Sequence, residues 1–147
     1  MGQESGKAAT ARVRGVASSP QRGRKFAKSQ IRLVSGMGVE GDAHFGPGNR
    51  QVSVLMVELA LAAGIEPEPG DFAENLLVEG LDQAIALGSR LKVGSCVIEV
   101  AEIGKPEWRP GDYSHKGRAF LAEGGLFCRV LTGGVVWPGD EVAVMDI

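Results

Sequence analysis

Cysteine, aromatic residues and long apolar runs are all scarce in this chain of 147 residues. Its two cysteines, Cys96 and Cys128, are too few for a disulfide framework, so we expect a reduced, cytoplasmic setting. No apolar run approaches the roughly 18 residues that a membrane span requires, and residues 1–10 lack the apolar segment of a secretory signal. Positive charge is not in excess either: the net charge of −2 argues against a dedicated nucleic-acid surface.

The composition favours a single compact domain built from short strands. Hydrophobic residues make up 44% of the chain, enough for a packed core, and the 22 glycines suit many tight turns. Apolar patterns predict strands over residues 12–18, 31–34, 51–56, 127–131 and 141–145, and a hairpin of 90–93 with 97–101. A short helix is expected over 58–64 and turns over 132–134 and 138–140, while the type of 72–79 stays open. We therefore predict a mostly-β barrel with short helices over residues 12–147, preceded by a flexible N-terminal arm over 1–11.

A glycine-rich loop before the third predicted strand is the first candidate site. It places Asp42, His44 and Arg50 on a backbone interrupted by five glycines. The N–H groups of such a loop can bind an anion, and a guanidinium can clamp an oxyanion with two hydrogen bonds. The alternative is a polar surface turn without a ligand.

Two further polar segments are candidates for the same site. Asn75 ends the segment 69–75 and can both donate and accept hydrogen bonds, although this segment can also serve only as a helix or turn cap. Lys105 follows a predicted strand and can bind phosphate, and Trp108 can stack on a flat heterocycle. The alternative for residues 103–109 is a solvated turn with the indole folded onto the core.

Other reactive side chains show no recognised arrangement. His44 and His115 have no thiols at a ligand spacing, so we expect no metal site. Cys96 and Cys128 stand beside apolar strand residues, where a thiol is expected to act as a small buried hydrophobe. The chain has no nucleophile-elbow, phosphate-loop or dinucleotide fingerprint, so hydrolase, kinase and dehydrogenase functions lack support.

Several short motifs, taken in order, resemble the stand-alone MOSC domains, which are related to the C-terminal domain of molybdenum cofactor sulfurase. They are GVEGDAH at 38–44, RQVS at 50–53, PGDFAENL at 69–76 with EG at 79–80, GSRLKVG at 88–94, IGK at 103–105, GLFCRVLTGG at 125–134 and PGD at 138–140. Each motif is weak alone, but their order and spacing agree from about residue 13 to residue 144.

This resemblance implies a barrel that binds molybdenum cofactor, in its molybdopterin form or as a related phosphorylated pterin, and that takes part in sulfur delivery. The binding residues it implies are Asp42, His44, Arg50, Asn75 and Lys105. A cysteine desulfurase or a molybdoenzyme is the implied partner. In larger eukaryotic members the sulfur originates at a separate pyridoxal-phosphate desulfurase domain, and we expect none in a chain of 147 residues.

One departure from the family bears on sulfur transfer. Members of the family carry a cysteine shortly after the Gly-Lys pair, as the presumed persulfide carrier, but here that position falls on Glu107 or Trp108. Neither a carboxylate nor an indole can hold a persulfide. Whether the protein is an enzyme therefore stays open, as does its oligomeric state.

Three hypotheses follow. The first is a module that binds the cofactor without carrying sulfur. The second is an active sulfurtransferase with its persulfide on Cys128 or Cys96. The third is a structural or regulatory barrel with no small-molecule ligand. Burial of the two thiols separates the first hypothesis from the second, because a carrier thiol must be exposed.

Overall fold

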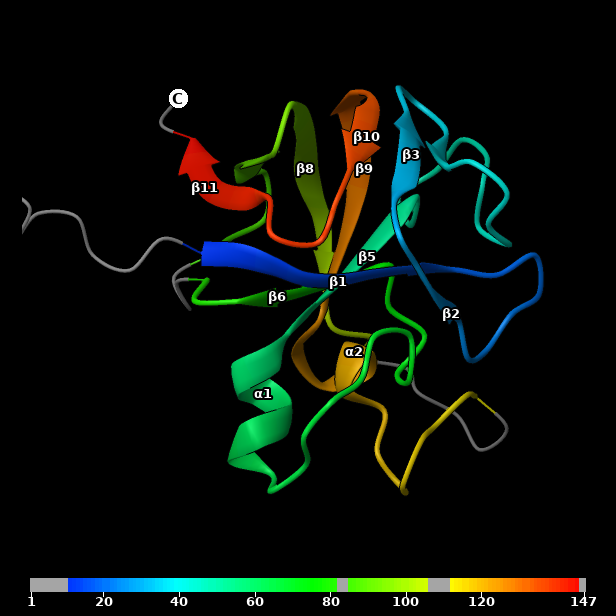
Figure 1. Ribbon diagram of the computed structural model, residues 1–147, viewed down its shortest axis with the longest axis vertical. Coiled ribbons are helices and arrows are strands. Elements are labelled where there is room, and N and C mark those ends of the chain that lie inside the picture. The colour runs from blue at the N-terminus through cyan, green and yellow to red at the C-terminus, as the bar shows by residue number, and fades with distance from the viewer. Residues whose placement is uncertain (1–10, 82–84, 106–111, 146–147) are drawn as a thin grey trace, which may run out of the picture.

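A mostly-β domain, seen in a computed structural model, is formed by residues 11–81, 85–105 and 112–145, which are the residues that the structure describes (Figure 1). The strands are β1 (Ala11–Ser18), β2 (Phe26–Lys28), β3 (Ile31–Val34), β4 (Gly38–Val39), β5 (Val52–Met56), β6 (Leu76–Glu79), β7 (Arg90–Val93), β8 (Cys96–Ile103), β9 (Leu126–Thr132), β10 (Gly134–Val136) and β11 (Glu141–Met145). Two short helices, α1 (Val57–Ala62) and α2 (Phe120–Gly124), complete the described part, and neither is long and apolar enough to cross a membrane. The predicted fold class is confirmed.

Seven strands close into a barrel in the order β11-β7-β8-β9-β5-β6-β1, and β1 pairs back onto β11 with Ala11 opposite Val142. Strand β2 extends the sheet beyond β1. Closure removes the exposed edges that such short strands would otherwise present. Within the described barrel β5 and β6 form the parallel pair, and α1 lies in the crossover connection that a parallel pair requires.

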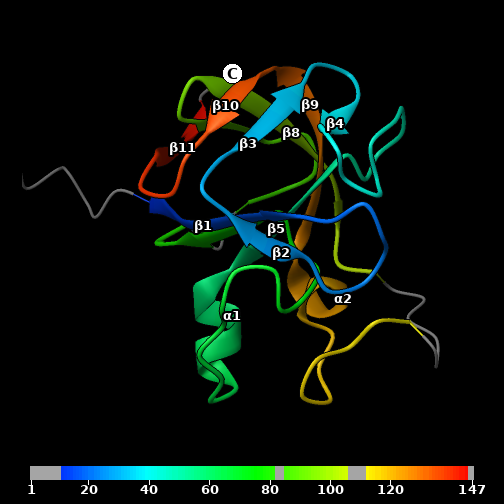
Figure 2. The ribbon, with the colours of Figure 1, turned by 45° about the vertical axis from the view of Figure 1, so that its right-hand side comes forward.

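The two ends of the barrel differ. Figures 1 and 2 both show α1 and α2 at one end, and β3 and β10 at the other. There β10, β3 and β4 form a separate three-stranded antiparallel sheet.

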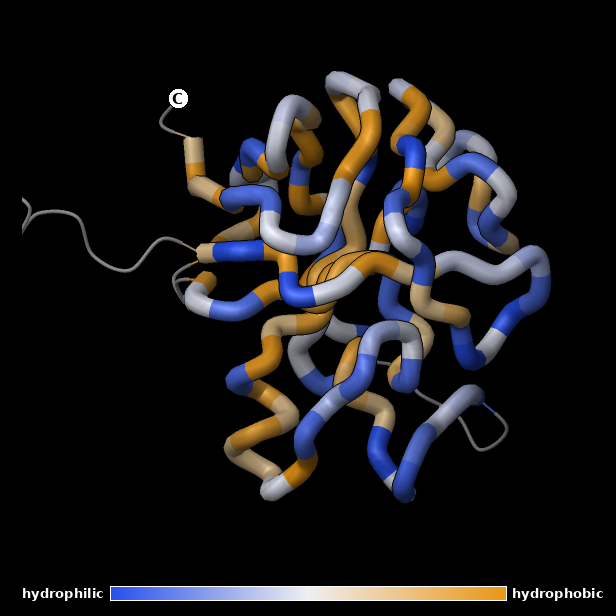
Figure 3. The backbone as a smooth tube through the Cα atoms, in the orientation of Figure 1, coloured by the Kyte–Doolittle hydropathy of each residue, from blue (hydrophilic) through white to orange (hydrophobic). Residues whose placement is uncertain are grey.

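The core follows from the alternation of apolar residues along the strands. In β1, Ala11 and Val13 are buried whereas Arg12 and Arg14 are exposed, as expected for side chains that point to opposite faces. Figure 3 shows apolar residues concentrated along the strands, where polar residues interrupt them, and mostly polar residues in the loops. A second, smaller cluster packs both helices onto the barrel around Phe120, and its other buried members are Leu55, Val57, Ala60, Phe72 and Leu77.

A close approach of backbone holds the turn before β6 against β1. A Cβ atom on Gly15 would overlap the ring of Pro69, so only glycine allows this contact. Gly70 has a positive φ of 87°, and a Cβ there would collide with the carbonyl of Lys25. These contacts place residues 69–75 beside the β1–β2 loop, where they form part of the cavity described below.

Several boundaries differ from those expected. Strand β1 begins at Ala11, which we had placed in the flexible arm, and Ala11 is buried; residues 1–10 lie outside the described residues. The segment 132–134, expected as a turn, instead ends β9 and begins β10. The segment 72–79 supplies a turn followed by β6. Strands β2, β4 and β10 and helix α2 were not predicted, because each is only two to five residues long.

Candidate functional site

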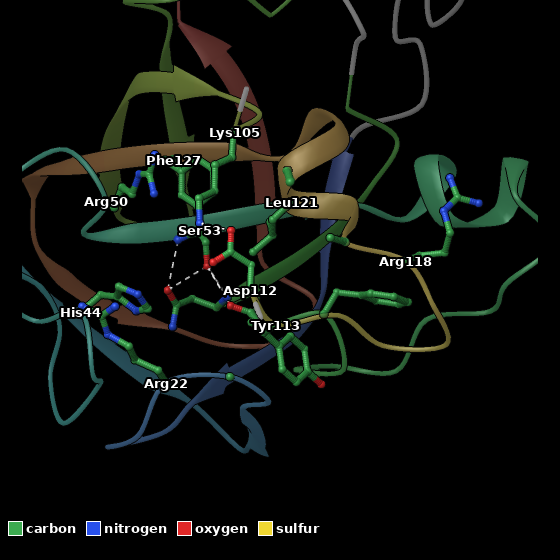
Figure 4. Close-up of a pocket in the computed structure, with 16 residues that line it drawn as sticks. Arg22, His44, Arg50, Ser53, Lys105, Asp112, Tyr113, Arg118, Leu121 and Phe127 are labelled. Atoms are coloured by element: carbon green, nitrogen blue, oxygen red, sulfur yellow. Dashed lines mark hydrogen bonds and ion pairs between the residues drawn. The ribbon is translucent and has the colours of Figure 1, made fainter. Parts of the chain in front are cut away.

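A cavity of about 460 Å³ opens where five separate stretches of chain meet (Figure 4). They are the β1–β2 loop, the loop before β5, the turn before β6, residues on both sides of segment 106–111, and α2 with the start of β9. Ser53 lies in its wall, and Phe72, Tyr113, Leu121 and Phe127 contribute aromatic and aliphatic surface. A cavity of this size falls within the range of small-molecule binding sites.

Four of the five residues implied as binding residues line this cavity: His44, Arg50, Asn75 and Lys105. Arg50 and Lys105 share its wall although 55 positions separate them in the sequence. Asp42, the fifth, does not line the cavity and is buried behind it. The structure thus brings the three candidate segments together, but it gives their side chains different tasks.

Asp42 forms a buried ion pair with Lys25. The Lys25 ammonium contacts both carboxylate oxygens at 2.9 and 3.1 Å, and neither side chain has exposed surface. The backbone N–H groups of Ser19 and His44 also donate to this carboxylate, each at 3.1 Å. Burial by itself raises the pKa of Asp42, but the contacts with His44, Lys25 and Ser19 outweigh it and hold that pKa well below its usual range. The pair therefore stays charged and ties the β1–β2 loop to the turn that carries His44.

Asn75 is a framework residue of the cavity wall. Its amide nitrogen donates to the carbonyl of Ala17 at 3.1 Å and to Asp42 at 3.2 Å. Its amide oxygen accepts from the backbone N–H and the hydroxyl of Ser53, at 3.0 and 3.2 Å. Because both ends of the amide are engaged, Asn75 joins β1, β5 and the start of β6 and has little capacity left for a ligand.

Arg50 and Lys105 are cations held in place by carboxylates. Arg50 contacts Glu102 through Nε and Nη2, with the shortest distance at 2.8 Å, and its guanidinium lies 4.9 Å from the ring centre of Phe127. The Nη1 group of Arg50 has no hydrogen-bond partner among the described residues. Lys105 pairs with Asp112 at 2.9 Å. Both cations are thus oriented before any ligand arrives.

Sequence reasoning missed Arg22, Tyr113 and Arg118, which also line the cavity. Arg22 stands in a basic segment that we had interpreted only as a turn. Arg118 pairs with Glu123 at 2.6 Å and lies over the ring of Phe120. The wall holds four Arg and Lys side chains, and Asp112 is the carboxylate among its described residues, so the cavity favours anions.

A buried carboxyl group shapes the turn beneath the cavity. Glu74 is 1% exposed and accepts hydrogen bonds from the backbone of Gly70 at 2.7 Å and Phe72 at 3.0 Å. Burial raises its pKa to about 7, although these backbone donors oppose the rise. Ala73, which lies between Phe72 and Glu74 and lines the cavity, adopts a positive φ of 70°. This is a strained conformation for a residue with a side chain.

Both cysteines lie in the barrel core, as predicted from their apolar neighbours. Cys96 and Cys128 have no exposed surface, and neither lines the cavity. Burial raises the pKa of each thiol, so little thiolate forms at neutral pH. The family cysteine position, Glu107 or Trp108, lies outside the described residues. Within the described part of the chain, no cluster of three or more His, Cys, Asp or Glu side chains is placed to hold a metal ion.

The barrel resembles the crystal structures of the YuaD protein from Bacillus subtilis and of YiiM from Geobacillus stearothermophilus and Escherichia coli. Sequence identities are 20%, 16% and 19%, and TM-scores are 0.66, 0.66 and 0.65. The matches cover 91%, 92% and 92% of this chain and 94%, 75% and 70% of theirs. At such identities they show a shared fold.

No curated protein sequence matches the chain. The family model of the MOSC domain, however, matches residues 41–143. That range runs from the turn holding Asp42 through the cavity wall to β11, and so includes most of the barrel. The chain therefore belongs to the MOSC domain family.

Proposed function

We propose that the cavity binds molybdenum cofactor, or a related phosphorylated pterin, and that the protein acts in the sulfuration or delivery of that cofactor. The observation that carries the proposal is the shared wall of His44, Arg50 and Lys105, which come from distant segments and surround one cavity rich in cations. A phosphorylated pterin is anionic at one end and flat at the other. Cations and the aromatic faces of Phe127 and Tyr113 suit those two parts.

The side chains present fit this group. Arg50 would hold an oxygen of the ligand through Nη1, which has no partner among the described residues, while Glu102 and Phe127 keep the guanidinium oriented. Lys105, paired with Asp112, would add a second positive charge on the same wall. When bound, the cofactor supplies the metal chemistry that the described residues do not offer, and the role of the protein is to bind, orient and shield it.

In this proposal the protein does not itself carry sulfur. Cys96 and Cys128 are enclosed in the core, so neither can reach a ligand in the cavity without unfolding of the barrel. Sulfur would come from a cysteine desulfurase, and the loaded cofactor would pass to a molybdoenzyme. This argument also weighs against the alternative of a persulfide on either cysteine.

Calorimetric titration of the full chain with molybdopterin tests the proposal. We expect saturable binding that Arg50→Gln weakens roughly tenfold, the lower end of what a charge-assisted hydrogen bond contributes, because part of the guanidinium stays engaged by Glu102. Arg129→Gln is the matched control: Arg129 also pairs with a glutamate, Glu99, but lies outside the cavity. The affinity of Arg129→Gln for molybdopterin should equal that of the wild type. Absence of binding by the wild type would favour a barrel without a small-molecule ligand.

A further inference from the structure

The positive charges of the cavity are not equally available to a ligand. Arg50 is paired with Glu102, Lys105 with Asp112, and Arg118 with Glu123. Arg22 lines the same cavity, and among the described residues its side chain has neither an ion-pair nor a hydrogen-bond partner. Arg22 is exposed, and a guanidinium that lines a cavity without a counter-ion among the described residues keeps all of its N–H donors for an incoming anion.

The backbone around Arg22 is anchored on both sides, so its Cα atom starts from a fixed position. On one side, the N–H of Gln21 donates to the Ser19 hydroxyl at 3.1 Å. On the other, Lys25 is held by its buried ion pair with Asp42. Gly23 packs on Tyr113, where an added Cβ would come within 3.3 Å of the ring. Binding would therefore order one side chain and not a whole loop, which lowers its entropic cost.

His44 lies on the same side of the cavity as Arg22 in Figure 4. The two loops are joined directly, because the N–H of Ala43 donates to the carbonyl of Ser19 at 2.7 Å. The imidazole keeps 37% of its surface exposed although one nitrogen lies 3.6 Å from Asp42. Arg22 and His44 thus offer a guanidinium and an imidazole from two neighbouring, anchored loops.

We infer that Arg22, together with His44, forms the anion-binding end of the cavity, and that the group it takes is a phosphate monoester. A guanidinium matches phosphate with two parallel hydrogen bonds, and a monoester carries close to two negative charges at pH 7. The aromatic surface of Phe72, Tyr113 and Phe127 in the same cavity then receives the remainder of the ligand, a flat ring. The inference rests on the proposed function for the identity of that ring, but the phosphate end stands on the unpaired charge alone.

Titration of the full chain with inorganic phosphate, followed by amide chemical shifts, tests the anion site. We expect saturable shifts at Gly23 and His44 that Arg22→Gln weakens at least tenfold. Arg24→Gln is the matched control: it removes the same charge from the same loop, but Arg24 contacts Asp71 at 3.4 Å and does not line the cavity. Its phosphate affinity should stay within about twofold of the wild type. Equal weakening by both variants, or no saturation at tens of millimolar phosphate, would overturn the inference.

A second titration separates this inference from the proposed function. Molybdopterin and an unphosphorylated pterin are each titrated into the wild type and Arg22→Gln. We expect the variant to lose affinity for the phosphorylated ligand only. If phosphate binds through Arg22 but neither pterin binds, the proposed function fails and the anion site stands. If molybdopterin binds both proteins equally, the anion site fails and the proposed function stands. Unchanged thermal unfolding of the variant shows that it is folded.

Discussion

Replacement of Glu74 by glutamine is expected to remove a pH dependence from the stability of the fold. The Glu74 carboxyl is buried, and its pKa rises from 4.5 to about 7 on folding. Between these two values the folded protein still holds a proton that the unfolded chain has released. The free energy of unfolding of the wild type therefore falls as pH rises through this window. At about 1.4 kcal/mol for each pKa unit, the total loss is on the order of 3 kcal/mol.

The assay is urea unfolding of the wild type, Glu74→Gln and the control Glu68→Gln at several values between pH 4.5 and 7.5. Glutamine cannot titrate, so the free energy of unfolding of Glu74→Gln should not decline with pH in this window. The variant also loses one of the two oxygens that accept from the backbone of Gly70 and Phe72, but that cost is the same at every pH. Glu68 is exposed in the same turn, and its replacement should leave the wild-type slope unchanged. The other ionisable groups are shared by the three proteins, so their contributions cancel in the comparison. Parallel curves for the wild type and Glu74→Gln would refute the reasoning.

Three further predictions concern the buried ion pair, the two thiols and the transfer of sulfur. Asp42→Asn should lower the free energy of unfolding by about 3–5 kcal/mol in urea titrations, because it leaves the buried Lys25 ammonium without its counter-ion; a loss below 1 kcal/mol would contradict the pair's role. Cys96 and Cys128 should not react with a thiol reagent in native buffer and should both react in denaturant, since each is fully buried; reaction before unfolding would show otherwise. Incubation with a cysteine desulfurase and cysteine should add no sulfur to the wild-type mass, whereas Glu107→Cys should gain one sulfur atom; a gain on the wild type that is lost in Cys128→Ser would restore the sulfurtransferase hypothesis.

Most strands of the barrel, though not β6, were predictable because their signal is local. In β1, β5 and β9 the apolar residues follow the two-residue period of a strand or fill both faces, and the pattern identifies them without knowledge of their neighbours. Strands β2, β4 and β10 have only two or three residues, so their neighbours in the sheets determine their conformation. Helix α2 has five residues and no side-chain cap, and its sequence therefore has no start signal.

The candidate site was predictable only as a set of segments. Family motifs indicated which loops to consider, and the structure brings His44, Arg50, Asn75 and Lys105 to one cavity. Their binding roles stay predictions. Arg22 was overlooked, because one arginine in a basic turn is typical of a solvent-exposed loop and no periodicity distinguishes it.

Local composition and patterning thus determined the longer strands and the burial of the two thiols, since each depends on apolar residues adjacent in the chain. Only the tertiary structure decided the task of each polar group. Asp42 became the buried partner of Lys25, 17 positions away, and Asn75 joined Ala17, 58 positions away, while Arg22 has no counter-ion among the residues that the structure describes. A charged or amide side chain contacts whichever complementary group the fold brings within hydrogen-bonding distance, and over such separations that proximity is a property of the closed barrel as a whole.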